Sequence, residues 1–241
     1  MTVKAHAKIN WTLEVLGIRP DGYHDLRSIV LPVGLHDEIT FAEAEDVECE
    51  TVGLDIPREK NLAYRAALAL RDATGCASGA RISIVKRIPS GAGLGGGSSD
   101  AAAVLNALNA MWGLHLPCER LCEIAAGIGS DVPALVMGGP VLMEGRGERV
   151  RRIDACLLRE LGEDALPPPE SIKVYYPGIF SSTPAVYREF RASDRGKGSN
   201  DLQPAALRIY PGIADALRHL EKMGLKRITM SGSGSAVYGV V

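Results

Sequence analysis

The segment from Pro89 to Ser99 carries the strongest chemical signal in the chain, because it holds five glycines and two adjacent hydroxyls. Glycine has no Cβ, so the backbone N–H groups of such a loop can turn toward one point. A helix that begins directly after the loop would add unpaired N–H groups and a partial positive charge. This combination predicts a site for a polyphosphate. The residues concerned are Pro89, Ser90, Gly91, Ala92, Gly93, Leu94, Gly95, Gly96, Gly97, Ser98 and Ser99.

The glycines also match the dinucleotide fingerprint G-x-G-x-x-G over residues 91–96. A domain that transfers hydride fits the rest of the chain less well, because no further strand–helix–strand series and no clear ribose-binding acid follows at the expected spacing. The nearest acid, Glu119, lies in a polar segment that opens the next predicted helix. The P-loop pattern with Gly-Lys-Ser/Thr is absent as well. We therefore favour a polyphosphate site over a hydride-transfer site.

Two adjacent hydroxyls, Ser98 and Ser99, close the loop, and Asp100 follows them. Their oxygens suit phosphate groups and a magnesium ion, and Ser99 is the group best suited to contact the metal. A simpler interpretation is that Ser99 or Asp100 caps the helix that follows. Capping needs one residue and leaves the five glycines unexplained, so we expect a phosphate site in which a cap also forms.

Three more polar clusters lie elsewhere in the chain. Lys8 and Asn10 are on one side of an apolar N-terminal segment, where a lysine is more commonly a solvated edge residue. Tyr23 and His24 follow a turn and present an aromatic ring and an imidazole, which elsewhere often only cover a core. Asp131 follows a glycine-flexed corner at a predicted helix start, where a cap is the simple interpretation. Each cluster alone is weak evidence for a functional site.

A second glycine- and hydroxyl-rich turn covers 231–235, between two predicted strands. Its members Gly232, Ser233 and Gly234 could simply form a tight hairpin. Two glycine–serine loops in one chain would also allow a phosphate chain to be enclosed from both of the lobes predicted below.

The elements that must position these residues follow from hydrophobic periodicity and from turn signals. The polar, acidic segment 157–170 contains three consecutive prolines and is the best candidate for a linker. Strands and helices mix without regular alternation, which predicts an α+β fold in two lobes. The first predicted helix begins near 61 and ends before Gly75. Further predicted helices begin near 100 and 117 and cover 184–190 and 212–223. Predicted strands cover 5–16, 26–35, 37–42, 81–88, 141–150, 172–176, 227–230 and 236–241.

Composition places the chain among ordinary soluble globular proteins, since 46% of its 241 residues are hydrophobic and 23% are charged. The formal net charge of −2 gives no general attraction to nucleic acid or membrane, so an anion site must be local. No apolar run reaches the length of a membrane span, and the N-terminus lacks the apolar stretch of a signal peptide. Five scattered cysteines fit free thiols in a reducing cytoplasm, where we expect the protein to act.

Taken together, these segments resemble a small-molecule kinase superfamily that includes galactokinase, homoserine kinase and mevalonate kinase. Within it, the resemblance is closest to the 4-diphosphocytidyl-2-C-methyl-D-erythritol kinase family of the non-mevalonate isoprenoid pathway. It runs from about residue 5 to residue 238. The segments that carry it are 7–10, 21–24, 89–100, 129–133 and 231–236.

The resemblance implies an N-terminal lobe like ribosomal protein S5 domain 2 and a ferredoxin-like C-terminal lobe, with the active site between them. We accordingly predict an ATP-binding lobe over 1–156, a linker over 157–170 and a second lobe over 171–241. Two features depart from the family pattern. The linker looks long, and the chain stops at Val241, where the family continues through a further helix.

The resemblance also implies a reaction, the ATP-dependent phosphorylation of the 2-hydroxyl of 4-diphosphocytidyl-2-C-methyl-D-erythritol with magnesium. Asp131 matches the family's general base and Lys8 its catalytic lysine. Tyr23 and His24 match residues at the cytosine end of the substrate. Asn10 and Thr183 match other substrate contacts, Asn61 and Lys86 residues beside the adenosine, and 89–99 with Gly232, Ser233 and Gly234 the triphosphate site.

Three alternatives stay open at this stage. The chain could be a kinase of the same superfamily that acts on another small alcohol such as homoserine, but Tyr23 and His24 favour a substrate with an aromatic base. It could be a nucleotide-binding module without catalysis, but such a module needs neither Lys8 nor Asp131. It could also be a dehydrogenase. We expect a small-molecule partner that carries cytidine diphosphate, no nucleic acid and no membrane, and either a monomer or a homodimer.

Overall fold

The computed structural model describes residues 1–53 and 56–241, within which the strands form two separate sheets. The larger sheet has the order β3-β4-β2-β5-β6, and β1 pairs antiparallel with nearly the whole length of β2. In the smaller sheet β9 lies between β7 and β8. The strands are β1 (Thr2–Ile18), β2 (His24–Ala42), β3 (Val47–Thr51), β4 (Ala80–Val85), β5 (Val141–Gly145), β6 (Arg149–Arg152), β7 (Ile172–Tyr175), β8 (Lys226–Met230) and β9 (Val237–Val240).

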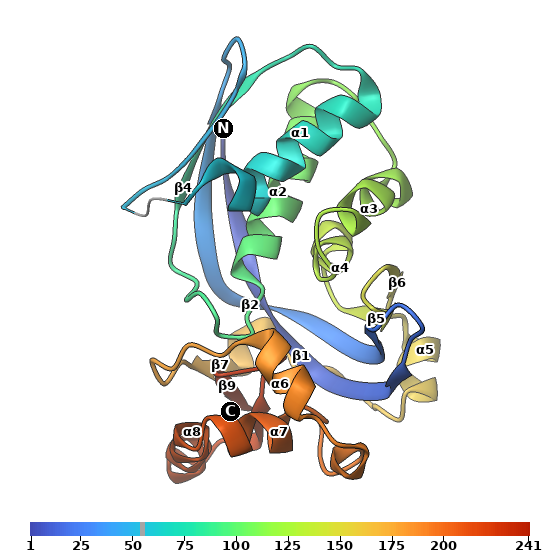
Figure 1. Cartoon of the computed structure of the whole chain (residues 1–241), viewed down its shortest axis with the longest axis vertical. Helices are drawn as coiled ribbons and strands as arrows, with labels where there is room; N and C mark the ends of the chain where they lie inside the picture. Colours follow the sequence, from blue (N-terminus) through green and yellow to red (C-terminus); the bar gives the residue numbers. More distant parts are fainter. Residues whose placement is uncertain (54–55) are drawn as a thin grey trace.

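The helices divide between the two sheets (Figure 1). Helices α1 to α4 lie together beside the large sheet, whereas α6 to α8 lie with the small sheet, and the β1–β2 hairpin reaches from one part to the other. This arrangement confirms the predicted α+β fold in two lobes. The helices are α1 (Leu62–Thr74), α2 (Gly96–Met111), α3 (Cys118–Ala126), α4 (Val132–Met137), α5 (Ala155–Glu160), α6 (Thr183–Glu189), α7 (Gln203–Ile209) and α8 (Gly212–Lys222).

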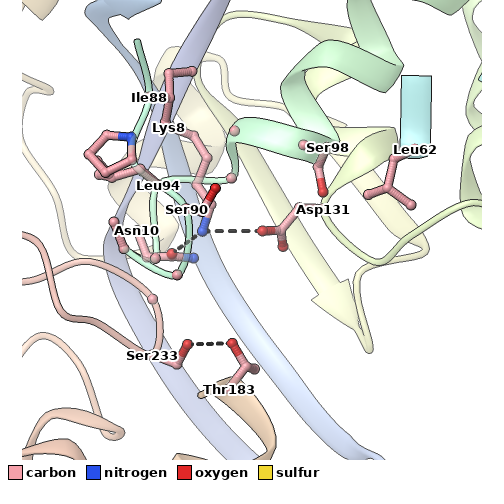
Figure 2. A pocket seen from close by; sticks show the side chains of 18 of the residues that line it. Lys8, Asn10, Leu62, Ile88, Ser90, Leu94, Ser98, Asp131, Thr183 and Ser233 are labelled. Atoms are coloured by element: carbon pink, nitrogen blue, oxygen red, sulfur yellow. Dashed lines mark hydrogen bonds and ion pairs between the residues drawn. The ribbon is translucent and has the colours of Figure 1, made fainter. Parts of the chain in front are cut away.

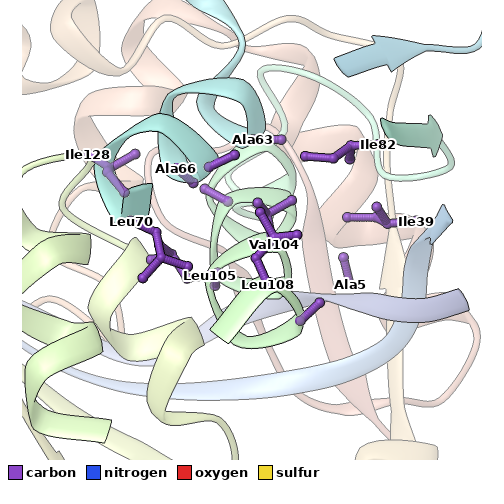
Figure 3. Packing of buried hydrophobic residues seen from close by; sticks show 14 of the residues in the cluster. Ala5, Ile39, Ala63, Ala66, Leu70, Ile82, Val104, Leu105, Leu108 and Ile128 are labelled. Atoms are coloured by element: carbon purple, nitrogen blue, oxygen red, sulfur yellow. The ribbon is translucent and has the colours of Figure 1, made fainter. Parts of the chain in front are cut away.

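Small residues let α1 pack closely on α2 in the core of the first lobe (Figure 3). Ala63, Ala66 and Leu70 of α1 are fully buried, and they belong to one cluster with Leu105 and Leu108 of α2. Strand side chains close the opposite side of this cluster. Burying each leucine side chain stabilises the fold by roughly 1.5–3 kcal/mol.

The predicted ends of α1 are confirmed. The Asn61 side chain accepts the backbone N–H of Ala63 at 3.0 Å, as an N-cap does. Gly75 ends the helix with φ +68°, a left-handed conformation that glycine adopts without cost.

Two strand predictions need correction. Segments 26–35 and 37–42 belong to one strand, because His36 pairs with His6 of β1 and the ladder continues past the polar residues between them. Segment 141–150 is a hairpin of β5 and β6, because Gly145 and Gly147 reverse the chain with positive φ of +75° and +124°.

The strand predicted over 81–88 and the helix predicted from 100 have different boundaries in the structure. β4 ends at Val85, and the Asp37 side chain accepts the backbone N–H groups of Arg87 and Ile88 beyond it. α2 already begins at Gly96, because tertiary packing overrides the low helix propensity of two glycines. The sequence analysis did not predict β3 or α7.

Segment 157–170, the predicted linker, lies between β6 of the large sheet and β7 of the small sheet. It begins inside α5, which Asp154 caps by accepting the backbone N–H of Leu157 at 2.8 Å. Glu163 then forms an ion pair with Arg227 of β8. The Arg227 guanidinium lies 3.9 Å from the centroid of the Trp11 ring, so the segment is fixed against both lobes.

The β1–β2 hairpin supplies core to both lobes. Leu13 and Val15 of β1 share a buried cluster with Leu220, Met230 and Val237 of the second lobe. The second lobe therefore packs directly on the first.

In the described residues, no helix is both long and apolar enough to cross a bilayer. All five cysteines are free thiols, as predicted. Burial raises the pKa of the Cys49 thiol to about 11, so this side chain is a poor nucleophile at neutral pH.

Candidate active site

A β-bulge in β1 decides which way its polar side chains point. The register with β2 shifts between His6 and Lys8. Ala5, before the shift, packs in the cluster with α1 and α2, whereas Ile9, after it, packs in the cluster that includes β9. Because the bulge turns the alternation over, Lys8 and Asn10 point into the space beside α2 and α4.

Lys8 is the centre of a short polar chain (Figure 2). Its Nζ donates to Asn10 Oδ1 at 2.7 Å and lies 3.3 Å from Asp131 Oδ2. Asn10 Nδ2 donates in turn to the Ser28 hydroxyl at 2.8 Å. Lys8 is 4% exposed, whereas the Asp131 side chain is 32% exposed. The Asp131 carboxylate is therefore the solvent-accessible end of this series of polar groups. Two acceptors offset the cost of burying the ammonium group.

Asp131 stands at the start of α4 but does not cap it. Within the described residues its side chain accepts no hydrogen bond from the helix N–H groups, so the simple capping interpretation is wrong. Backbone contacts hold the corner instead. Val132 N donates to Gly129 O at 3.1 Å, and Ser130 O approaches Gly147 so closely that a Cβ there would lie 2.1 Å away.

Four consecutive carbonyl groups of the glycine loop, those of residues 91 to 94, bond to other segments of the protein. Because each of these four carbonyls has a protein donor, this part of the loop is held in place without a ligand. The pairs are Gly91 O with Ser181 N (2.8 Å), Ala92 O with Ala236 N (3.0 Å), Gly93 O with the Ser231 hydroxyl (2.9 Å) and Leu94 O with Lys8 N (3.0 Å).

The N–H groups of the loop are left free. Among the described residues, no backbone N–H from 90 to 98 donates to a protein acceptor. Gly95 is the N-cap residue of α2 and offers no side chain, so neither Ser99 nor Asp100 caps the helix as the simpler interpretation held. Free N–H groups beside a helix N-terminus form a nest for an anion.

The second glycine turn meets the first loop from the other lobe. At Gly93 a Cβ would lie only 2.2 Å from Ser231 O. The hydroxyls of Thr183 and Ser233 are hydrogen-bonded at 2.7 Å, and the Ser181 hydroxyl donates to Ser233 O at 2.7 Å. The two glycine–serine loops therefore lie together.

A cavity of about 340 Å³ opens between the two loops and the polar chain of Lys8. Most of the residues that the sequence analysis singled out line it. They are Lys8, Asn10, Lys86, Pro89, Ser90, Gly91, Ala92, Gly93, Leu94, Gly95, Gly96, Gly97, Ser98, Asp131, Thr183, Gly232 and Ser233.

A second cavity, of about 710 Å³, adjoins the first, since Thr183 and Tyr187 line both. Tyr23 and His24 line this second cavity, and the His24 ring lies 4.8 Å from the Tyr187 ring. Burial, and then the charge of Arg195, hold the pKa of His24 below its ordinary value. The imidazole is therefore neutral at pH 7 and can both donate and accept a hydrogen bond.

Three arginines give the second cavity a positive wall. Arg146, Arg188 and Arg195 line it, and the Arg146 guanidinium lies 5.0 Å from the centroid of the Tyr23 ring. In the part of the chain that the structure describes, no Asp or Glu lines this cavity, and none lies within salt-bridge distance of the three arginines. Cations and aromatic rings without acids suit a ligand that carries both a ring and negative charge.

Three predicted residues do not line either cavity. Asn61 points back into its own helix as the cap described above. The Ser99 hydroxyl donates to the backbone O of His6, so Ser98, and not Ser99, presents its hydroxyl to the phosphate nest. Gly234 belongs to the second turn but packs against the second lobe, where a Cβ would lie 2.7 Å from the Met230 sulfur.

Several residues of the site were not predicted from the sequence. Tyr187 follows Thr183 by one helical turn on α6, a spacing that could have suggested it. Arg195 and Arg146 carried no local signal, because only the tertiary structure brings their segments to the cavity. Asp37 was missed for the same reason: it reaches the base of the glycine loop from β2.

Family models and solved structures show which known proteins the chain is similar to. The family description "GHMP kinases N terminal domain" matches residues 61–139, and "GHMP kinases C terminal" matches residues 184–241. A solved 4-(cytidine 5'-diphospho)-2C-methyl-D-erythritol kinase is similar over 100% of this chain and 90% of its own, with a TM-score of 0.82 and 35% identity. A homoserine kinase from Cytophaga hutchinsonii shares the fold, with a TM-score of 0.67 at 17% identity over 100% of this chain and 85% of its own.

Curated relatives give the same result. A 4-diphosphocytidyl-2-C-methyl-D-erythritol kinase from Pelotomaculum thermopropionicum is 40% identical over 100% of this chain and 88% of its own length. The enzyme of that name from Prosthecochloris aestuarii is 38% identical, with the same two coverages. The GHMP kinase domains and these relatives show an ATP-dependent small-molecule kinase. The chain belongs to the 4-diphosphocytidyl-2-C-methyl-D-erythritol kinase family of GHMP kinases.

Proposed function

We propose that the protein transfers the γ-phosphoryl group of ATP to the 2-hydroxyl of 4-diphosphocytidyl-2-C-methyl-D-erythritol. One observation carries the proposal: the Lys8–Asp131 ion pair lines a cavity that holds the N–H nest and that adjoins a second cavity of aromatic rings and arginines. ATP would bind in the first cavity and the cytidine-bearing substrate in the second. Thr183 and Tyr187, which line both, mark where the acceptor hydroxyl would meet the γ-phosphate.

The protein side chains would act mainly by alignment and charge stabilisation, as in phosphoryl transfer generally. Asp131 would accept the proton of the attacked hydroxyl, a contribution of typically ~10²–10⁴-fold. Lys8, held by Asn10, would orient that hydroxyl and stabilise the charge that develops between acceptor and phosphate. The N–H groups of 90–98 would hold the triphosphate at positions that already carry matching dipoles.

The lining of the second cavity supports a substrate with a cytosine ring and a diphosphate. Tyr23 and Tyr187 offer ring faces, and neutral His24 offers a donor and an acceptor to the base edge. The three arginines offer charge-assisted bonds to the diphosphate. Homoserine and mevalonate have neither a base nor a diphosphate and would leave these groups without partners.

Magnesium would be held mostly by the nucleotide. Among the described residues there is no cluster of three or more His, Cys, Asp or Glu side chains that could hold a metal alone. Magnesium typically takes one or two protein oxygens, with water and phosphate as the rest of its shell. The Ser98 hydroxyl fits that need from inside the nest, and the ion would neutralise phosphate charge.

We also infer the finer features that the sequence resemblance implies. The three-stranded β7-β9-β8 sheet with its helices supports a ferredoxin-like second lobe, and the first lobe would resemble ribosomal protein S5 domain 2. The reaction would serve the non-mevalonate pathway to isoprenoids in the cytoplasm.

An ATP-consumption assay with a panel of acceptors tests the proposed function. We expect turnover with diphosphocytidyl-methylerythritol, and negligible turnover with methylerythritol phosphate, homoserine or mevalonate. Phosphorus NMR of the product should show a new phosphate monoester with the diphosphate intact. Equal turnover with homoserine or mevalonate would reject the substrate assignment.

A further inference from the structure

A buried ion cluster lies beside the glycine loop and has no part in the chemistry proposed above. It consists of Asp37 of β2, Lys86 directly after β4, and Asp100 of α2. Lys86 Nζ donates to Asp37 Oδ2 and, at 2.6 Å, to Asp100 Oδ2. Asp37 is fully buried, Asp100 is 5% exposed, and the Lys86 side chain is 13% exposed.

The cluster ties together the two ends of the loop. Before the loop, the chain leaves the sheet after Val85, and the N–H groups of Arg87 and Ile88 donate to Asp37 Oδ1, the latter at 2.8 Å. After the loop, Asp100 lies in the first turns of α2. Because Lys86 bridges the two carboxylates, the entry and the exit of the loop are fixed to one point on β2.

The cluster also touches the nest itself. At Gly96, the first residue of α2, a Cβ would lie 3.3 Å from Lys86 Nζ and 3.0 Å from Ile88 Cγ2. The position of the Lys86 side chain therefore constrains the positions of the first N–H groups of α2. An anion nest depends on such placement, since a displacement of about 1 Å in a positioned site can cost on the order of 10²-fold in function.

Stability alone is a weak reason for this cluster. Two carboxylates and one ammonium are costly to bury, and apolar residues of similar volume often serve the fold equally well. A role in geometry explains what stability does not, because both ends of one loop meet at the cluster.

We propose that Asp37 and Asp100 are positioning residues for the nucleotide. Through Lys86 they hold the two ends of the glycine loop at the separation at which its N–H groups converge on the triphosphate of ATP. This inference rests on the proposed assignment of the loop to ATP. Neither carboxylate is required to touch a reactant.

Nucleotide and substrate affinities, measured separately by calorimetry on the full chain, test the inference. In Asp37→Asn and Asp100→Asn we expect the Kd for ATP to rise by about tenfold or more, because a neutral amide holds the Lys86 ammonium, and with it the loop ends, less firmly than a carboxylate does. The Kd for diphosphocytidyl-methylerythritol should stay unchanged. Asp100→Asn is the milder variant, because Asp100 Oδ1 is a buried atom with no hydrogen-bond partner in the described chain.

Asp194→Asn is the matched control. Asp194 is also buried, pairs with Arg208 at 2.7 Å and accepts the backbone N–H of Arg191 at 2.9 Å, but it lines neither cavity. This variant should lower the melting temperature and leave the Kd for ATP unchanged.

Two results would overturn the inference. One is an unchanged Kd for ATP in folded Asp100→Asn, which would make the cluster structural only. The other is an equal rise in the Kd for ATP in Asp194→Asn, which would make the effect one of general stability. If the unmodified protein bound no ATP, the proposed function would fail instead, so the two failures are distinguishable.

Discussion

Lys8 and Asp131 contact each other but are held in different ways. Lys8 is buried, and its ammonium has one fixed neutral acceptor in Asn10, so its direction does not depend on a ligand. The Asp131 side chain is a third exposed and makes no capping bond within the described residues. The carboxylate is therefore available for an acceptor hydroxyl.

Asp131→Asn should collapse turnover while leaving the Kd for ATP almost intact. The amide keeps the shape of the carboxylate but cannot take a proton, so kcat should fall by ~10²–10⁴-fold. Steady-state kinetics and an ATP titration check this expectation. An ATP affinity that falls as far as the rate would contradict the general-base role.

His24 provides a prediction about pH. Its pKa is lowered by burial and by Arg195, so the folded state binds the proton more weakly than the unfolded chain does. The stability that neutral His24 contributes is present above the unfolded pKa of about 6.5 and is lost as the pH falls below it. Arg195→Ala should raise the pKa of His24 toward its ordinary value, although burial remains.

Proton NMR titration of the imidazole measures that change. Arg188→Ala is the control, because Arg188 lines the same cavity but does not contribute to the lowered pKa of His24. A pKa of His24 that stays the same in Arg195→Ala would show that burial alone sets it.

Among the elements, the glycine loop is the one most constrained by its neighbours. Its carbonyls bond to β1 and to the second lobe, so the loop is shaped by segments far away in the chain. Gly93 is the tightest point, with φ +74° and the carbonyl of Ser231 where a Cβ would stand.

Gly93→Ala should cost more stability than Gly113→Ala and should also abolish ATP binding. Gly113 is the matched control, because it has a similar φ of +63° but no atom within 4 Å of a Cβ. A left-handed alanine costs roughly 1–2 kcal/mol at either position, and only Gly93→Ala adds a backbone clash. Urea denaturation and an ATP titration separate the two effects, and equal losses of stability would contradict the clash.

At the scale of the whole molecule, the two lobes share their cores. Trp11 stacks with Tyr238 of β9, their ring centroids 6.1 Å apart, and the Tyr238 hydroxyl donates to the backbone O of Asn10 at 3.0 Å. The last strand of the chain thus supports the segment that carries Lys8.

Because the two lobes share buried clusters, we predict that both unfold in one transition. The chain has two tryptophans, Trp11 between the lobes and Trp112 in the first lobe, where it donates to Gly79 O at 3.2 Å. In urea, the unfolding curves of Trp11→Phe and Trp112→Phe measured by fluorescence should therefore coincide with those measured by far-UV circular dichroism. Leu13→Ala should lower the free energy of unfolding by about 2–5 kcal/mol and move the curves of both probes together.

A separate transition of the second lobe at lower urea would contradict this shared core. The tryptophan replacements need their own circular dichroism curves as controls, since Trp11 is buried and Trp112 packs partly buried against the core of the first lobe.

The elements that sequence could predict were those with a local cause. Asn61 and Gly75 mark the ends of α1 by their own capping chemistry, and the apolar and β-branched residues of β1 and β2 favour strands by their own propensity. Among the elements that were missed, β3 depends on the distant β4 for its ladder. Helix α5 has a local cap in Asp154, but it covers the start of a segment whose three later prolines suggested a linker.

The candidate chemical groups of this protein could be found in the sequence: a run of glycines able to free its N–H groups, one carboxylate, one lysine and a pair of rings. Those features depend on residue type and short spacing, which a sequence states directly. Three further features follow from the tertiary fold: Ser98 and not Ser99 faces the nest, the Asp131 carboxylate lies beside Lys8 without capping its helix, and Lys86 joins Asp37 to Asp100 at the base of the loop. Each of these depends on a bulge, a lobe contact or a buried ion pair between residues distant in sequence, and such contacts leave no local pattern.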